Sequence, residues 1–292
     1  MDERVVVDRG NRVENALICA LESKSKTRCL DLLSCRPWPV NMLDIVVPEW
    51  VRHGPVAERA SIYSCHINAA GTHLATGGGD CRVKIWSLDP IWNEASTSPK
   101  LLCVSNVHSE PVNCVRWSPC GHFLATCSGD KIVFVLRKGA QYSKPMVLLG
   151  EKEPNYENWE EHARFMGHTF DVLHVAWCPK TPPPGRLASC GLDRNIFVWQ
   201  VGTREPIKKI ETNFPCKGIA WDPIGTYLAG QVSGGEGANH QVCVWRISDW
   251  KLESTTVKGF ESPDDTSFLR LSWSPDGQQL ATVCQKKNCC CQ

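Results

Sequence analysis

Three residue types used by hydrolases stand at suggestive positions in this chain. His168, Ser189 and Asp193 are the types of a hydrolytic triad, in which histidine takes the proton of serine and a carboxylate orients the histidine. A nucleophile is needed once, however, and related sets recur in two other parts of the chain. Ser189 also lacks the Gly-x-Ser-x-Gly elbow that exposes such a nucleophile. We therefore predict a structural role for these residues and no enzymatic activity.

The recurring set has a regular spacing. A hydroxyl stands four residues before an aspartate, and six residues after that aspartate comes Trp or, once, Leu136. In two of the units a histidine stands nine residues before the Trp of the first strand: His108 before Trp117, and His168 before Trp177. Buried polar groups are costly unless paired, so we expect a hydrogen-bond chain inside each unit. The structural residues predicted in this way are His108, His168, Thr76, Thr126, Ser189, Asp80, Asp130, Asp193, Trp86, Trp199 and Trp245.

The 17 cysteines do not form a recognisable metal site. Structural zinc sites use ligand pairs two to four residues apart, and no Cys-x-x-Cys pair occurs. Most cysteines stand singly among apolar residues, as small buried side chains do. The run 289–291 interrupts a repeat and is interpreted as accidental rather than as a site. We predict no metal and no cofactor.

Composition narrows the class of protein. Lys and Arg number 32 against 31 Asp and Glu, which gives no basic footprint for binding nucleic acid or a membrane surface. No apolar run approaches the ~20 residues that span a bilayer. The N-terminus lacks the pattern of a secretory signal, so we expect an intracellular protein with reduced cysteines.

A repeat explains the spacing of these residues. Its core, apolar-x-Trp-(Ser/Asp)-Pro-x-Gly-x-x-Leu-Ala, lies within 114–136, 218–230 and 270–282. Of two further copies, the one at 65–86 has Ile67 in place of Trp, and the one at 174–199 has a Pro-rich insertion in its turn. Each unit alternates apolar strands with Pro-Gly and Gly-Asp turns, and recurs about every 45–60 residues here, against ~40–45 for a WD40 blade. The sequence predicts an all-β WD40 β-propeller.

The predicted organisation leaves an incomplete ring. Four complete blades and a partial fifth are expected as an open fragment of a larger ring, with exposed strand edges and poor solubility of the isolated chain. Residues 44–54 are predicted to be a lone strand, and residues 138–158 either a solvated loop or a partner-facing element. The expected segments are a disordered extension (1–41), a propeller (42–284) with blades at about 59–105, 107–166, 167–211, 213–257 and 266–284, and an aberrant tail (285–292), which suggests a truncated chain.

Several stretches resemble one family of propellers. "PEWVRHG", "VNCVRWSPCGHFLAT", "GIAWDPIGTYLAG", "ISDWKLESTTVKGFE" and "LRLSWSPDGQQLAT" together are similar to the N-terminal propeller of the histone regulator (HIRA) family. "YENWEEHARFMGH" is similar to the WD40 subunit of chromatin assembly factor one, which stays an alternative beside a generic WD40 adaptor.

The resemblance implies a seven-bladed ring, of which this chain would be an open fragment, and a nuclear histone chaperone subunit. Such a protein is a scaffold in replication-independent nucleosome assembly and transcription regulation. Its implied partners are a ubinuclein-like subunit, histones three and four, and other chromatin-assembly subunits, with no membrane and no sequence-specific nucleic acid. No short motif identifies the partner-binding residues.

Overall fold

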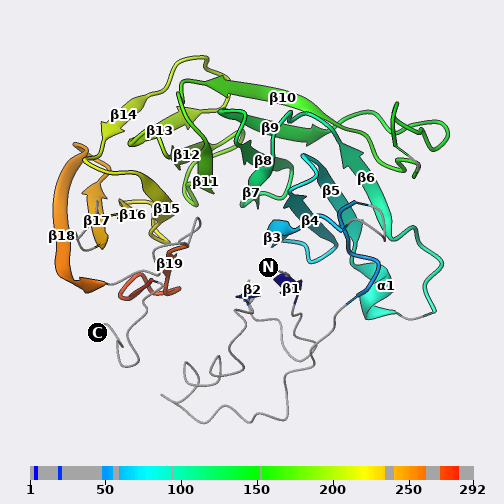
Figure 1. Ribbon diagram of the computed structural model, residues 1–292, viewed down its shortest axis with the longest axis horizontal. Coiled ribbons are helices and arrows are strands. Elements are labelled where there is room, and N and C mark those ends of the chain that lie inside the picture. Colours follow the sequence, from blue (N-terminus) through cyan, green and yellow to red (C-terminus); the bar gives the residue numbers. More distant parts are fainter. Residues whose placement is uncertain are drawn as a thin grey trace, which may run out of the picture.

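The computed structural model describes residues 3–5, 19–21, 48–54, 59–93, 95–151, 153–233, 240–260 and 270–282. Within these ranges the fold is almost entirely β, with antiparallel sheets arranged as an arc around a central axis (Figure 1). The first strand of each sheet lies nearest the axis and the fourth lies at the periphery. This arrangement confirms the predicted all-β propeller, with four four-stranded blades and a two-stranded fifth among the described residues.

The strands follow the repeat. Blade one contains β3 (Ile62–Ile67), β4 (His73–Gly78), β5 (Val83–Ser87) and β6 (Leu101–Ser105), and blade two contains β7 (Val112–Trp117), β8 (Phe123–Ser128), β9 (Ile132–Lys138) and β10 (Trp159–Met166). Blade three contains β11 (Val172–Trp177), β12 (Arg186–Gly191), β13 (Asn195–Gln200) and β14 (Lys208–Glu211). Blade four contains β15 (Cys216–Trp221), β16 (Tyr227–Val232), β17 (His240–Arg246) and β18 (Lys251–Phe260), and the fifth sheet β19 (Ser272–Trp273) and β20 (Leu280–Ala281).

Two minor elements lie outside the blades. The short helix α1 (Asp89–Trp92) follows β5, with a proline in its first turn. Strands β1 (Glu3–Val5) and β2 (Cys19–Leu21) pair antiparallel within the segment expected to be an extension. The rest of residues 1–41, like the tail 285–292, lies outside the described residues.

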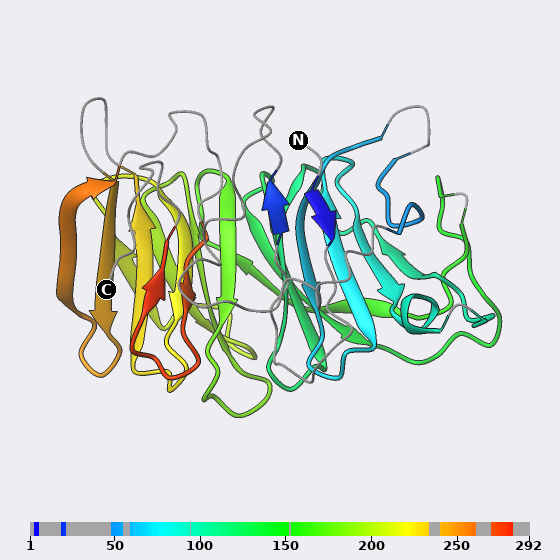
Figure 2. The ribbon, with the colours of Figure 1, turned by 90° about the horizontal axis from the view of Figure 1, so that it is seen from below.

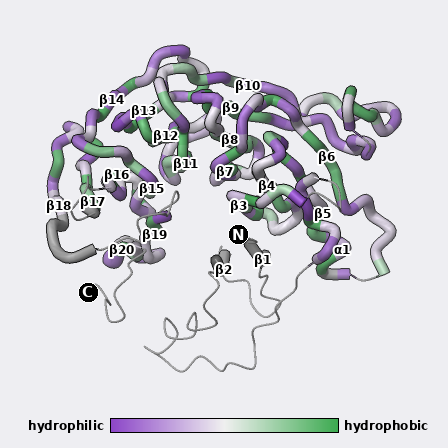
Figure 3. The backbone as a smooth tube through the Cα atoms, viewed as in Figure 1, coloured by the Kyte–Doolittle hydropathy of each residue, from purple (hydrophilic) through white to green (hydrophobic). Residues whose placement is uncertain are grey.

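The core is formed between neighbouring sheets. Apolar residues of blade two, such as Cys127 and Val135, pack against Leu187 and Trp199 of blade three in one buried cluster. Figure 2 shows the sheets standing side by side, and blade two contributes residues to one buried cluster with blade one and to another with blade three. This burial on both faces agrees with the nearly continuous burial of second strands such as β8 and β12. The peripheral strand β10 is mostly exposed or half-buried and is purple along much of its length in Figure 3.

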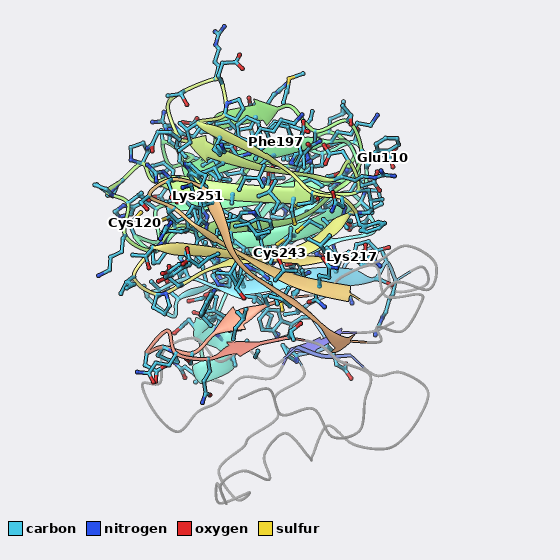
Figure 4. The ribbon with its side chains drawn as sticks, turned by 90° about the vertical axis from the view of Figure 1, so that its left-hand side faces the viewer. Glu110, Cys120, Phe197, Lys217, Cys243 and Lys251 are labelled. Atoms are coloured by element: carbon cyan, nitrogen blue, oxygen red, sulfur yellow. The ribbon has the colours of Figure 1, made fainter. Side chains whose placement is uncertain are left out.

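The ring has two distinct faces. The Ser/Asp-Pro-x-Gly turn after each first strand lies on one of them, here called the proline-turn face, and the segment that precedes the first strand lies on the other, the histidine face. Figure 4 places Cys120, of the turn after β7, and Glu110, of the segment before it, at opposite edges of the molecule.

Two local expectations are wrong. Residues 44–54 are not one strand in their described part, because Val51 N donates to Pro48 O and closes a turn at 48–51. Only an isolated bridge between His53 and Ala60 follows. The "TGGGD" stretch (76–80) has the composition of a glycine turn, which is what its sequence predicts, but Gly77 and Gly78 end strand β4. A Cβ on Gly78 would lie 2.8 Å from His53 Nδ1, so glycine here allows the histidine to approach.

Candidate functional site

The third blade contains a four-residue hydrogen-bond chain. Trp199 Nε1 donates to Ser189 Oγ at 2.8 Å, and Ser189 Oγ lies 2.7 Å from His168 Nε2. His168 Nδ1 lies 2.9 Å from Asp193 Oδ2. Because the carboxylate only accepts, Nδ1 carries the hydrogen and Nε2 accepts from the hydroxyl. The side chains of His168 and Asp193 are 1% and 0% exposed.

The same chain recurs in blade two without its tryptophan. His108 Nδ1 lies 2.8 Å from Asp130 Oδ2, and His108 Nε2 lies 2.9 Å from Thr126 Oγ1. Leu136 replaces the tryptophan and is fully buried, so the indole donor is absent from this network. The ring of Phe134 lies edge-on to His108, with centroids 4.9 Å apart.

Blade one has a complete network whose histidine the repeat spacing does not reveal. His53 Nδ1 lies 2.6 Å from Asp80 Oδ1, His53 Nε2 lies 2.8 Å from Thr76 Oγ1, and Trp86 Nε1 donates to that hydroxyl at 2.9 Å. His53 precedes Ile67, the residue in the strand-Trp position, by 14 residues rather than nine. Because of this extra length, a nine-residue spacing does not identify His53. A histidine in "RHG" that precedes a Thr-x-x-x-Asp pair is the sequence feature that could have identified it.

Each aspartate also fixes the turn around it. Asp193 accepts from the backbone N–H groups of Thr169 and Asn195, and Asp80 accepts from those of Gly54 and Arg82. Burial opposes ionisation of Asp80 and of Asp193, but the hydrogen bonds from histidine and backbone hold the pKa of both carboxyls below its usual value. The networks therefore connect the segment before each first strand to the turn between the second and third strands.

This geometry is poor for hydrolysis. Ser189 is 0% exposed, and its oxygen already accepts the indole N–H of Trp199. A substrate carbonyl would have to reach a nucleophile that lies inside the sheet packing. Burial and a complete set of partners are instead what a structural lock requires.

The fourth blade departs from the pattern. Strand β16 has Gly230 at the position that Thr76 and Ser189 occupy in their strands. A Cβ on Gly230 would lie 2.8 Å from Trp245 Cζ3, so the indole ring fills this space. Trp245 is 5% exposed and belongs to the apolar cluster between blades three and four. In this blade the tryptophan acts through packing rather than through a hydroxyl.

The strand tryptophans join neighbouring blades. Trp117 Nε1 donates to His66 O at 3.0 Å and Trp177 Nε1 donates to Arg116 O at 2.9 Å. The same bond is repeated by Trp221 to Ala176 O at 3.0 Å and by Trp273 to Ala220 O at 3.2 Å. In every case the acceptor carbonyl belongs to the residue directly before the Trp position of the previous blade. The Trp-Pro motif thus makes one inter-blade bond per repeat and forms a belt on the proline-turn side of the channel.

Polar side chains lie inside this belt, around the central axis that the first strands surround; this region is called the channel. Arg270, just before β19, donates to Tyr63 O at 2.8 Å and Asn113 O at 3.3 Å, and approaches Cys114 Sγ at 3.4 Å. Trp117 N donates to His66 Nδ1 at 2.9 Å. Burial, with the nearby charge of Arg116, lowers the pKa of His66 to about 3. These residues were not identified from the sequence, because an isolated Arg or His carries no spacing signal.

The loop 139–158 packs on blade one. Asn155 accepts from Val104 N at 2.8 Å and donates to Val104 O at 2.9 Å, so the loop extends the outer edge of β6. Although burial opposes its ionisation, hydrogen bonds that include one from His73 lower the pKa of Glu157 to about 2. The tip remains uncovered, with Val147 and Leu149 at 55% and 99% exposure.

The described residues contain neither a metal-binding group nor a membrane-spanning helix. Among the described residues, no group of three or more His, Cys, Asp or Glu side chains is arranged to hold a metal ion. In the same part of the chain, no helix has the length and apolar character needed to cross a membrane.

Comparisons with known proteins agree with this architecture. A family model described as the CAF1B/HIR1 beta-propeller domain matches residues 45–288. Protein HIR1 of Cryptococcus neoformans is 39% identical over 247 residues, which cover 82% of this chain and 27% of that protein. Protein hir1 of Schizosaccharomyces pombe is 36% identical over 241 residues, which cover 80% of this chain and 25% of that protein. The chain therefore spans about a quarter of the length of these curated relatives.

One solved structure resembles this chain in its fold only. A chain in the crystal structure of a mitotic checkpoint complex matches with a TM-score of 0.58 and 19% identity. The match covers 80% of this chain and 59% of that chain.

Proposed function

Because this chain belongs to the CAF1B/HIR1 β-propeller family, we propose that it is a scaffold subunit of a HIR-type histone chaperone, acting in replication-independent nucleosome assembly and transcription regulation. The observation that carries the proposal is the family match over residues 45–288, which includes the strands and turns that connect the blades. The HIR1 relatives match over 82% and 80% of this chain and favour the HIR type within the family.

The structure supports a role in binding rather than in catalysis. Blade networks such as His168–Ser189–Asp193 are buried and hold the turns of the histidine face in place. A rigid framework of this kind lowers the entropic cost of presenting a binding surface. Affinity in such interfaces comes from a few desolvated side chains at the centre of a patch.

The proposed location and partners follow from the family resemblance. We place the protein in the nucleus, in a complex with a ubinuclein-like subunit and histones three and four. Partner binding is assigned to the propeller as a whole, because the family resemblance reaches the blade-building residues and identifies no interface motif.

Affinity purification of the tagged protein from nuclear extract, followed by mass spectrometry, tests this function. We expect histones three and four and a ubinuclein-like subunit to be recovered. Trp199→Ala should lose them because it removes a fully buried side chain from the blade core, whereas Ser143→Ala, at an exposed loop position, should retain them. Recovery of ubiquitin-ligase components without either partner would favour a generic adaptor and contradict the proposal.

The second candidate is a subunit of chromatin assembly factor one, since the matching family model names both groups. This candidate predicts that the co-purified complex lacks the ubinuclein-like subunit. The same purification therefore separates the two.

A further inference from the structure

The channel mouth on the proline-turn face is an aromatic cavity with a single fixed cation. It has a volume of about 480 Å³ and is lined by Trp117, Trp177, Trp221 and Trp273. Arg116 is the one Arg or Lys in its lining, and none of the described residues that line it is acidic. This volume falls within the ~300–1,000 Å³ of typical ligand pockets.

One nitrogen of the Arg116 guanidinium, Nη2, faces a ring nitrogen of His174 that does not accept a hydrogen bond from it. Nη1 donates to Ser64 Oγ at 3.0 Å and to Val115 O at 2.7 Å. Nη2 lies 3.1 Å from His174 Nε2, while Ile219 N donates to His174 Nδ1 at 3.2 Å. A neutral imidazole has only one acceptor nitrogen, so Nε2 carries the hydrogen when Nδ1 accepts.

Two N–H donors therefore face each other at the wall of the cavity. Burial lowers the pKa of His174, so its ring remains neutral, and its one acceptor nitrogen, Nδ1, is already occupied by Ile219 N. An oxygen with a negative charge could accept a hydrogen bond from Arg116 Nη2 and relieve this contact. Carboxylates suit the planar fork of arginine well.

We propose that this mouth binds an acidic linear peptide of a partner protein, whose Asp or Glu carboxylate meets Arg116 while neighbouring apolar side chains contact the tryptophan walls. The inference deepens the scaffold function proposed above and rests on it. Tryptophan and arginine are the side chains most enriched among interface hot spots. A nucleic acid is a poorer fit, because among the described residues that line the cavity its phosphates would find one arginine and no lysine.

The test uses a phage-displayed library of random dodecapeptides on the immobilised chain. We expect selected peptides to share an Asp or Glu beside apolar residues, and to lose about tenfold or more in affinity when that acid is changed to its amide. Pro119→Glu adds a negative charge at the exposed rim of the cavity and should weaken binding by a similar factor. Ile207→Glu adds the same charge on the 44%-exposed Ile207, which does not line the cavity, and should leave affinity unchanged.

Arg116→Lys keeps the charge but removes the fork, and should also weaken binding. Selection of no binder, a consensus without an acid, or equal affinity for Pro119→Glu and Ile207→Glu would overturn the proposal. Displacement of the peptide by a short single-stranded DNA would assign the mouth to nucleic acid and overturn it as well. A chain that binds these peptides but recovers no histones would contradict the proposed function alone.

Discussion

Arg270 joins the fifth sheet to the first by donating to the carbonyl of Tyr63, 207 residues earlier in the chain. The same guanidinium reaches Asn113 O in blade two, so one side chain connects three sheets across the channel. In a propeller whose neighbouring blades are otherwise joined in series, this contact is a direct link between distant parts of the arc.

The first prediction concerns this link. Arg270→Gln should lower the free energy of unfolding by about 1.5–3 kcal/mol, the usual contribution of hydrogen bonds to a charged group. Arg204→Gln removes an exposed arginine from a turn and should stay within about 0.5 kcal/mol of the unchanged protein. Urea denaturation followed by tryptophan fluorescence measures both, and equal midpoints for the two variants would show that Arg270 does not connect the sheets.

The second prediction concerns the blade-three network. Ser189→Ala leaves Trp199 Nε1 and His168 Nε2 without their shared partner in a buried site. Each unsatisfied buried group costs about 1–3 kcal/mol, so we expect a loss of about 2–6 kcal/mol in unfolding free energy. Thr126→Ala, in the network without an indole donor, should cost about half as much. Thermal denaturation of both variants checks this order, and a smaller loss for Ser189→Ala would contradict it.

The third prediction is a dependence of stability on pH. His53, His66 and His174 have pKa values lowered by burial, that of His66 to about 3. Between these values and the ordinary ~6.5 the unfolded chain binds more protons than the folded protein, so stability rises with pH. Acidification from about pH 7 to 5 should therefore cost about 2 kcal/mol at most for each histidine that stays neutral.

Denaturant titrations between pH 5 and 7 measure this slope. His66→Gln should reduce it by about one histidine's share, because the amide does not titrate. His122→Gln, which removes a histidine of the cavity between blades one and two, is the comparison variant. An unchanged slope in His66→Gln would show that the pKa of His66 is the same in the folded and the unfolded protein.

The fourth prediction concerns the anchored loop. Asn155→Ala removes both hydrogen bonds to the backbone of Val104 from a residue that is 3% exposed. Hydrogen–deuterium exchange at residues 144–151 should then rise about tenfold or more, because the loop loses both side-chain bonds of Asn155 to β6 and keeps there the backbone bonds of Tyr156 and Glu157 to Leu102. Glu153→Gln alters an exposed position of the same loop and should leave exchange unchanged. Protection that survives in Asn155→Ala would mean that other contacts hold the loop.

The sequence predicts the repeated parts of this protein well and the unrepeated parts poorly. The strands, the Pro-Gly turns and the spacing from Ser189 to Asp193 and Trp199 recur, and recurrence is itself the signal. His53 escapes because the chain between it and β3 is longer than in the other blades. Its place is determined by Thr76 and Asp80 in three dimensions rather than by distance along the chain.

The channel residues illustrate a second limit. Arg116 and Arg270 stand beside apolar strand residues, where sequence patterns treat them as ordinary surface charges. Arg116 reaches His174, and Arg270 reaches Cys114, because the first strands of several blades are arranged around one axis. Contacts between blades depend on the curvature of the whole arc, which no single repeat encodes.

The measurement that tests the central claim most directly follows newly synthesised, tagged histone three into chromatin after depletion of this protein. We expect incorporation outside DNA replication to fall and to be restored by re-expression, while incorporation during replication continues. Loss confined to replicating chromatin, or no loss in either phase, would contradict a HIR-type function.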